Sequence, residues 1–185
     1  MQQTKKAAIE LSISTIVVIV IAMSMLILGL VLVRTIFTGA TYNVQELNKN
    51  VEAEINKLFN EQNDKTIVYL PNHDAEVKKG KGYGIAFGVK NTAQGEARAG
   101  SFHIDVKAST ISRDCPLSIS DANSYINLVA GGVDFNLLPG VDPHYNLIKM
   151  QVPDTAPLCS VSYDITVTKD SQPYANDFFT LTITA

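Results

Sequence analysis

The chain has 185 residues, which is enough for one modest globular domain and accessory segments. Its net charge of −3 offers no basic surface of the kind that binds nucleic acid or an acidic membrane face. The sequence contains no G-x-S-x-G, P-loop or H-E-x-x-H motif, so we expect neither an enzyme nor a bound cofactor.

An uninterrupted apolar run from Leu11 to Val33 is the first element. Crossing the hydrocarbon core of a bilayer takes about 20 apolar residues, whereas apolar runs of roughly 10–14 residues suit a buried core helix. A cleaved secretory signal is also shorter and ends in small residues, while Arg34 and bulky residues follow this run. The pattern therefore predicts a retained hydrophobic transmembrane helix over residues 8–37.

Positive charges on either side of this run predict its orientation. Lys5 and Lys6 precede it, and only Arg34 lies close after it. Because positive residues collect on the cytoplasmic side, we expect the N-terminus in the cytoplasm, the helix in the cell membrane and residues 38–185 outside the cell.

Helical periodicity continues beyond the apolar run, over residues 38–63. Apolar residues recur there at spacings of three and four: Val44, Leu47, Val51, Ile55, Leu58 and Phe59. This spacing places them on one stripe of an amphipathic helix that a small domain can cover. Asn43 followed by Glu46 resembles a capping box. We expect a continuous or lightly kinked helix from about residue 9 to residue 62.

From Thr66 onward the apolar period changes to two, which is typical of half-buried strands. Apolar residues alternate with polar or small ones in six runs: 82–89, 101–107, 133–137, 148–152, 161–168 and 179–184. Gly131-Gly132 is suited to a hairpin turn after a strand at 125–130. About eight short strands and no second helix predict an antiparallel β-sandwich over residues 64–185. The expected fold class is thus α+β, a long N-terminal hydrophobic helix followed by an all-β sandwich.

Glycines occupy one face of the 82–88 run. Such a face marks either a bulge or the close approach of a neighbouring backbone.

The two cysteines, Cys115 and Cys159, both lie in the part expected outside the cell. An even pair in an oxidising compartment predicts a disulfide, whereas a reducing compartment would leave two buried thiols. The bridge would stabilise the domain by about 4 kcal/mol in the chain-entropy model.

The three histidines, His73, His103 and His144, lie far apart in the sequence. His103 and Asp105 share one face of a predicted strand, but no third ligand accompanies them, so we predict no metal site. The loop at Asp121 also lacks the spacing of a calcium-binding EF-hand.

The segment Lys5-Lys6-Ala7-Ala8-Ile9-Glu10-Leu11-Ser12 runs straight into the apolar helix. It resembles the class III signal peptide of archaeal type IV pilins and archaellins, over about residues 1–35. The resemblance implies that a prepilin-type peptidase removes residues 1–7 by cutting between Ala7 and Ala8, with Lys5 and Lys6 as the basic recognition residues. It also implies an Ig-like fold for the sandwich.

The same resemblance implies a function. The chain would be a structural subunit of a type IV pilus-like cell-surface filament, a helical homo-oligomer built through the N-terminal helix by the pilus assembly machinery. Glu10 would attract the free amine of a neighbouring subunit, although it would be the third mature residue rather than the usual fifth. Alternatively, Glu10 serves as a favourable charge at the positive end of its own helix. The other interpretation is a monomeric, signal-anchored surface protein with an Ig-like adhesin or binding domain.

Overall fold

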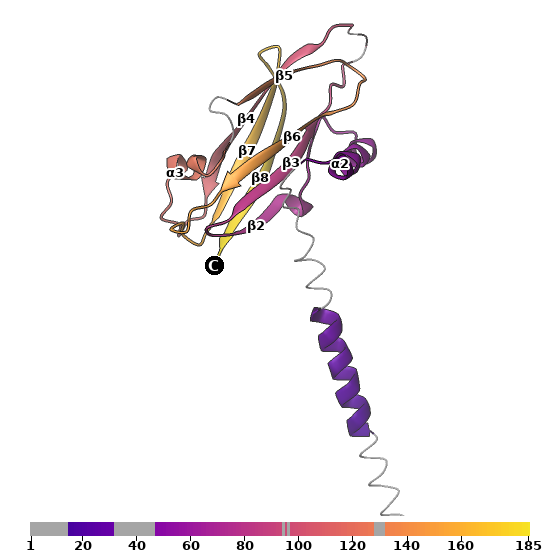
Figure 1. The fold of residues 1–185 in the computed structure, drawn as a ribbon, viewed down its shortest axis with the longest axis vertical. Coiled ribbons are helices and arrows are strands. Elements are labelled where there is room, and N and C mark those ends of the chain that lie inside the picture. The colour runs from indigo at the N-terminus through magenta and orange to yellow at the C-terminus, as the bar shows by residue number, and fades with distance from the viewer. Residues whose placement is uncertain (1–14, 32–46, 94, 96, 128–131) are drawn as a thin grey trace, which may run out of the picture. The chain divides into compact units, whose positions relative to one another are not determined.

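The computed structural model describes residues 15–31, 47–93, 95, 97–127 and 132–185. The chain divides into two compact units, Met1–Thr41 and Tyr42–Ala185. In the first unit the described residues, 15–31, form a helix, and the second unit holds the strands (Figure 1).

The first helix is described over residues 15–31. Across the described residues, no helix combines the length and the apolar character needed to cross a membrane. Residues 15–31 rise by about 25 Å, against roughly 30 Å for a hydrocarbon core. This finding overturns the predicted transmembrane helix over residues 8–37. The predicted cytoplasmic N-terminus, cell-membrane precursor and cell-surface location rested on that helix and are corrected with it.

A separate helix, α2 (Lys49–Gln62), begins at Asn48. The backbone of Asn48 is extended, with φ −125° and ψ 165°. Its side-chain oxygen accepts hydrogen bonds from the amides of Asn50 and Val51, both at 3.1 Å. Because an extended N-cap residue interrupts helical hydrogen bonding, the continuous helix predicted from residue 9 to residue 62 is wrong.

Helix α2 ends at its C-cap residue Asn63, which has a left-handed backbone conformation with φ 55°. Its amide donates to the carbonyl of Phe59 at 3.0 Å and so satisfies one of the last helical acceptors. The capping box expected at Asn43 and Glu46 lies outside the described residues.

The second unit contains two β-sheets. The strands in chain order are β1 (Thr66–Val68), β2 (Asp74–Lys78), β3 (Gly82–Val89), β4 (Gly100–Ile111), β5 (Val133–Leu137), β6 (His144–Gln151), β7 (Ser160–Lys169) and β8 (Gln172–Thr184). The small sheet has the order β1-β3-β6, and the large sheet has the order β2-β8-β7-β4-β5. A one-turn 3₁₀ helix, η1 (Pro71–His73), links β1 in the small sheet to β2 in the large sheet.

The large sheet is mixed, so the prediction of an all-antiparallel sandwich is wrong. Strand β2 runs parallel to β8, with Asp74 opposite Thr180 and Lys78 opposite Thr184. The other strand pairs of the described residues are antiparallel. The parallel pair arises because η1 carries the chain across to the other sheet, where β2 adds to the edge of the last strand.

The main core lies between the two sheets. It contains large, fully buried side chains from both sheets, including Phe87 of β3, Phe102 of β4, Tyr163 of β7 and Phe179 of β8. Alternate residues of β7 and of the C-terminal half of β8 are buried, as their period of two predicts.

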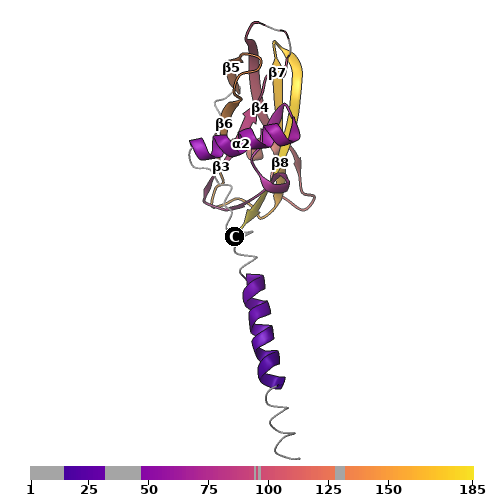
Figure 2. The ribbon, with the colours of Figure 1, turned by 90° about the vertical axis from the view of Figure 1, so that its right-hand side faces the viewer.

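Strand β3 is buried on both faces, whereas the sequence predicts a half-buried strand. Residues 84–89 are all buried because α2 packs across the outer face of the small sheet (Figure 2). A Cβ at Gly88 would lie 2.7 Å from Cε2 of Phe59 and 2.9 Å from Cγ2 of Ile55. The register of β3 against β6 is unbroken, so the glycine admits helix α2 and does not mark a bulge.

The chain between β4 and β5 differs from the predicted hairpin. It contains a short helix, α3 (Ile119–Ser124), which corrects the prediction of no second helix. Ile126 makes only an isolated bridge to Met150, and residues 128–131 lie outside the described residues. The buried hydroxyl of Tyr163 donates to the carbonyl of Ala122 at 2.9 Å and ties α3 to β7.

Candidate functional site

The first candidate surface is the helix of residues 15–31. Its large side chains are apolar on every side, and those from Ile16 to Val31 are 49–70% exposed. The polar hydroxyl of Ser24 is satisfied within the helix, since it donates to the carbonyl of Val20 at 2.7 Å. A surface helix of a globular protein normally keeps one polar face, and this helix has none among its described residues.

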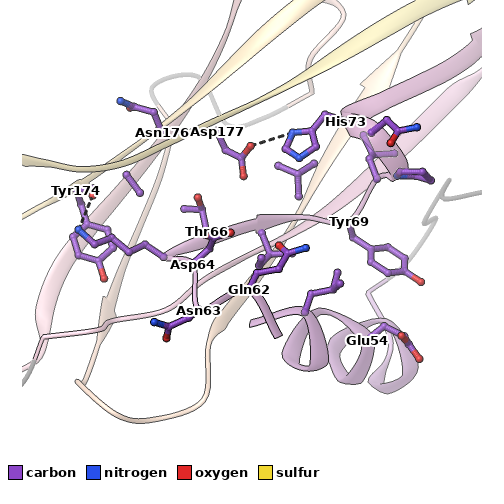
Figure 3. A pocket seen from close by; sticks show the side chains of 18 residues that line it. Glu54, Gln62, Asn63, Asp64, Thr66, Tyr69, His73, Tyr174, Asn176 and Asp177 are labelled. Carbon is purple, nitrogen blue, oxygen red and sulfur yellow. Dashed lines mark hydrogen bonds and ion pairs between the residues drawn. The ribbon is translucent and has the colours of Figure 1, made fainter. Parts of the chain in front are cut away.

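The second candidate is a groove of about 980 Å³ in the second unit (Figure 3). Its walls come from the C-terminal end of α2, the following turn, β1, η1 and residues 174–177 of β8. These elements belong to both sheets, so the groove lies where the sandwich opens between β1 and β8. Its lining is rich in carboxylate, carboxamide and tyrosine side chains.

Asp177 is the most deeply placed charge of the groove. It shares the inward parity of Phe179 and Leu181 on β8, and its side chain is only 13% exposed. One carboxylate oxygen accepts from the amide of Phe178 at 2.8 Å, and the hydroxyl of Thr66 also hydrogen-bonds to the carboxylate. Burial raises the pKa of Asp177, against the lowering effects of these hydrogen bonds and of His73.

His73 faces Asp177 across the groove, as Figure 3 shows. Its Nδ1 lies 2.9 Å from the carbonyl oxygen of Phe178 and 3.3 Å from Oδ1 of Asp177. Because a carbonyl only accepts, Nδ1 carries the proton, and Nε2 is the atom left to accept one. His73 has φ 60° and Asn72 before it has φ 51°. Such backbone is costly for these residues, and the contacts of His73 with β8 hold it in place.

Lys65 and Tyr174 close the opposite end of the groove. The ammonium of Lys65 lies 4.7 Å from the ring centroid of Tyr174 and donates to its carbonyl oxygen at 3.4 Å. The Tyr174 hydroxyl donates to the carbonyl of Lys90 at 2.7 Å and accepts from the amide of Thr92 at 3.0 Å. Tyr174 is therefore fixed between β8 and the chain that follows β3.

The structure does not bring the residues singled out from the sequence into one site. Lys5, Lys6, Ala7, Ala8 and Glu10 lie outside the described residues. Cys115 and Cys159 form a disulfide that joins the segment before α3 to the start of β7.

His103 and Asp105, which share a predicted strand face, contact different partners. Nδ1 of His103 lies 2.8 Å from Oδ1 of Asp134, while Asp105 contacts Lys107. His144 stacks on Phe135 with 3.8 Å between ring centroids, and burial lowers its pKa. Within residues 15–31 and the described parts of 47–185, no three His, Cys, Asp or Glu side chains are grouped to hold a metal ion.

Sequence reasoning missed the groove, although one signal for it is present in β8. Phe179, Leu181 and Ile183 point inward, and the same parity extended backwards reaches Asp177. A carboxylate at an inward position is costly unless it is paired. It therefore marks a place where partners from other elements converge. His73 and Thr66, about a hundred residues earlier, carry no such local signal.

No family model matches the sequence, and neither does any curated protein. Among solved structures, the chain is similar to a family 123 glycoside hydrolase from Clostridium perfringens, studied for glycolipid glycan hydrolysis. The identity is 10% and the TM-score 0.39 over 70% of this chain, which spans only 24% of that hydrolase. It is also similar to PapD-like domain 7 of human CEP192, with 9% identity, a TM-score of 0.35, and coverage of 65% of this chain and 84% of that one. Likenesses of this size carry no conclusion about function.

Proposed function

We propose that this chain is the structural subunit of a helical filament, in which copies assemble through the N-terminal apolar helix. The observation that carries the proposal is the helix of residues 15–31, which exposes apolar side chains on every side. The resemblance of residues 5–12 to the leader of archaeal type IV pilins and archaellins supports the same function.

Energetics favour covering this helix with copies of itself. Burying an exposed Leu, Ile, Val or Met side chain gains on the order of 1–2 kcal/mol when it is already partly shielded. About a dozen such side chains in residues 16–31 give a total on the order of 20 kcal/mol. Association costs roughly 4–15 kcal/mol, so bundling is favourable.

The same helix of a second chain can cover this helix, because it also exposes apolar side chains on every side. The outer face of the small sheet is not available, since Ile55 and Phe59 of α2 already fill it. A helix that packs on several neighbours head to tail generates an open helical assembly when the rotation does not close. Each copy would then bury its helix among others and keep its sandwich outside.

The leader residues have defined roles in this proposal. A prepilin-type peptidase would cut between Ala7 and Ala8, and Lys6 would be its recognition residue. Glu10 would then neutralise the new amine of a neighbouring subunit during assembly. Mass spectrometry of assembled material should find Ala8 at the N-terminus, and Lys6→Ala should abolish that processing. An intact N-terminus in assembled material would show that the subunit assembles without cleavage by such a peptidase.

A charge placed in the helix tests the assembly surface. Leu26 is 64% exposed, and Leu138, at the end of β5 in the second unit, is 47% exposed. An unpaired carboxylate buried among apolar helices costs several kcal/mol. We expect the chain beginning at Ala8, alone or with Leu138→Asp, to sediment as polymers in detergent-free buffer and the same chain with Leu26→Asp to remain small. Equal polymerisation of the two variants would show that the helix is not the assembly surface.

A further inference from the structure

The edge of β8 that faces the groove lacks a neighbouring strand over residues 174–178, because β2 pairs only with residues 180–184. Side chains take the place of a strand at two positions of this edge. Lys65 donates to the carbonyl of Tyr174 at 3.4 Å, and His73 donates to the carbonyl of Phe178 at 2.9 Å. Of the three residues between these two caps, one turns its backbone groups towards the same edge.

That residue is Asn176. The backbone amide of Ile183 donates to the carbonyl oxygen of Cys159 at 2.9 Å. Ile183 and the other odd-numbered residues of this part of β8 therefore turn their backbone N–H and C=O groups towards β7. In an antiparallel ladder the alternate residues face the other side. The N–H and C=O of Asn176 therefore point towards the groove edge, as one donor and one acceptor side by side.

The polar side chains that line the groove include four carboxamides and three carboxylates, against one lysine and one histidine: Gln62, Asn63, Asn72, Asn176, Glu54, Asp64, Asp177, Lys65 and His73. A carboxamide both donates and accepts, as a hydroxyl group does. The carboxylates repel an anion, and an amine, which only donates, leaves the carboxamide donors unmatched. The lining thus matches an uncharged ligand with several hydroxyl groups.

A second hollow of about 420 Å³ lies on the outer face of β8 and shares Asn176 and Asp177 with the groove. Its other lining residues include Thr166, which is opposite Asn176 in the β7–β8 ladder, and Phe178, which is opposite Asp164. Phe178 is 51% exposed, and its ring, which lies 5.0 Å from the ring of His73 between centroids, is an apolar group among polar ones. A sugar ring has the same combination of an apolar C–H face and a hydroxyl rim, and aromatic rings favour such a partner.

We propose that this groove, together with the adjoining hollow on the outer face of β8, binds a neutral carbohydrate. Its hydroxyl groups bond to the backbone and side chain of Asn176 and to Asp177, and a sugar ring packs on Phe178. An extended peptide fits less well, because a strand added to β8 would have to displace both Lys65 and His73. The groove volume of about 980 Å³ lies at the upper end of small-ligand sites and accommodates more than one sugar unit. This proposal does not depend on filament assembly.

The test uses the full chain on an array of neutral oligosaccharides of glucose, galactose, mannose and N-acetylglucosamine, followed by calorimetric titration with the oligosaccharide that binds most strongly. Three variants alter the groove or the adjoining hollow: Asn176→Ala, Asp177→Asn and Phe178→Ala. Two matched control variants lie on strand β5, away from the groove: Asn136→Ala and Asp134→Asn. Both residues are exposed, and Asp134, like Asp177, contacts a histidine. Thermal unfolding of each variant shows whether it is folded.

We expect binding that weakens about tenfold or more in each groove variant and stays unchanged in both controls, since one lost charged or bidentate hydrogen bond corresponds to about that factor. If Asp177→Asn does not fold, Asn176→Ala and Phe178→Ala decide, because both positions are exposed. The proposal is overturned if no neutral oligosaccharide binds at millimolar concentration, if groove and control variants bind equally, or if only peptides or charged ligands bind.

Discussion

The packing of α2 on β3 gives a sharp prediction at Gly88. In Gly88→Ala the added methyl group meets Phe59 at 2.7 Å and Ile55 at 2.9 Å, closer than real Cβ contacts. Neither side chain can give way easily, because Phe59 is 1% exposed and Ile55 is 0% exposed. Overpacking of this kind costs about 1–3 kcal/mol. Alanine also reduces the conformational entropy of the unfolded chain, which offsets about 0.4–1 kcal/mol of that cost. We therefore expect the free energy of unfolding to fall by about 1–2 kcal/mol.

The assay is thermal unfolding of the full chain followed by tyrosine fluorescence, since the protein has no tryptophan and seven tyrosines. For a unit of this size, about 1–2 kcal/mol corresponds to a fall of roughly 2–8 °C in Tm. Gly82→Ala on the same strand is the control, because its Cβ would meet the flexible end of Gln151 at 3.1 Å and the carbonyl oxygen of Met150 at an ordinary contact distance of 3.6 Å. If both variants unfold at the temperature of the unmodified protein, α2 does not pack on β3 as described.

Three further predictions concern stability. Replacing Cys115 and Cys159 together by serine should lower the free energy of unfolding by about 4 kcal/mol in urea titration, because the bridge closes a loop with a sequence separation of 44; an unchanged midpoint would argue against the bridge. Asn48→Ala should cost about 1 kcal/mol by removing the cap of α2, with Asn50→Ala as a control that leaves the cap in place. Burial raises the pKa of Asp177, so the folded state holds that proton more tightly than the unfolded chain. Its contribution to stability is present at low pH and is lost as pH rises through the raised pKa. Asp177→Asn should therefore gain stability relative to the unmodified protein between pH 4 and pH 7, and parallel pH profiles would contradict the burial of this carboxyl.

Local pattern was sufficient for several elements of the fold. The period of two at Val161, Tyr163, Ile165 and Val167 locates β7, because one face of that strand is in the core and the other in solvent. The stripe of Val51, Ile55 and Phe59 likewise identified the side of α2 that packs on the domain. Both predictions depend only on periodicity and the position of the solvent.

Other features depended on contacts that no local pattern contains. The boundary of α2 is set at Asn48 by its side chain, while the capping pattern at Asn43 looked equally suitable in the sequence. The direction of β2 follows from the crossing made by η1 between the two sheets. The groove joins Thr66 and His73 to Asp177 across more than a hundred residues, so only the folded chain assembles it.

Electron cryomicroscopy of the chain beginning at Ala8, in detergent-free buffer, tests the central claim most directly. We expect filaments whose axial core consists of packed copies of the helix that includes residues 15–31, with the sandwiches arranged around it. A preparation of dispersed, folded monomers under the same conditions would contradict the claim that this helix exists to pack against its own copies.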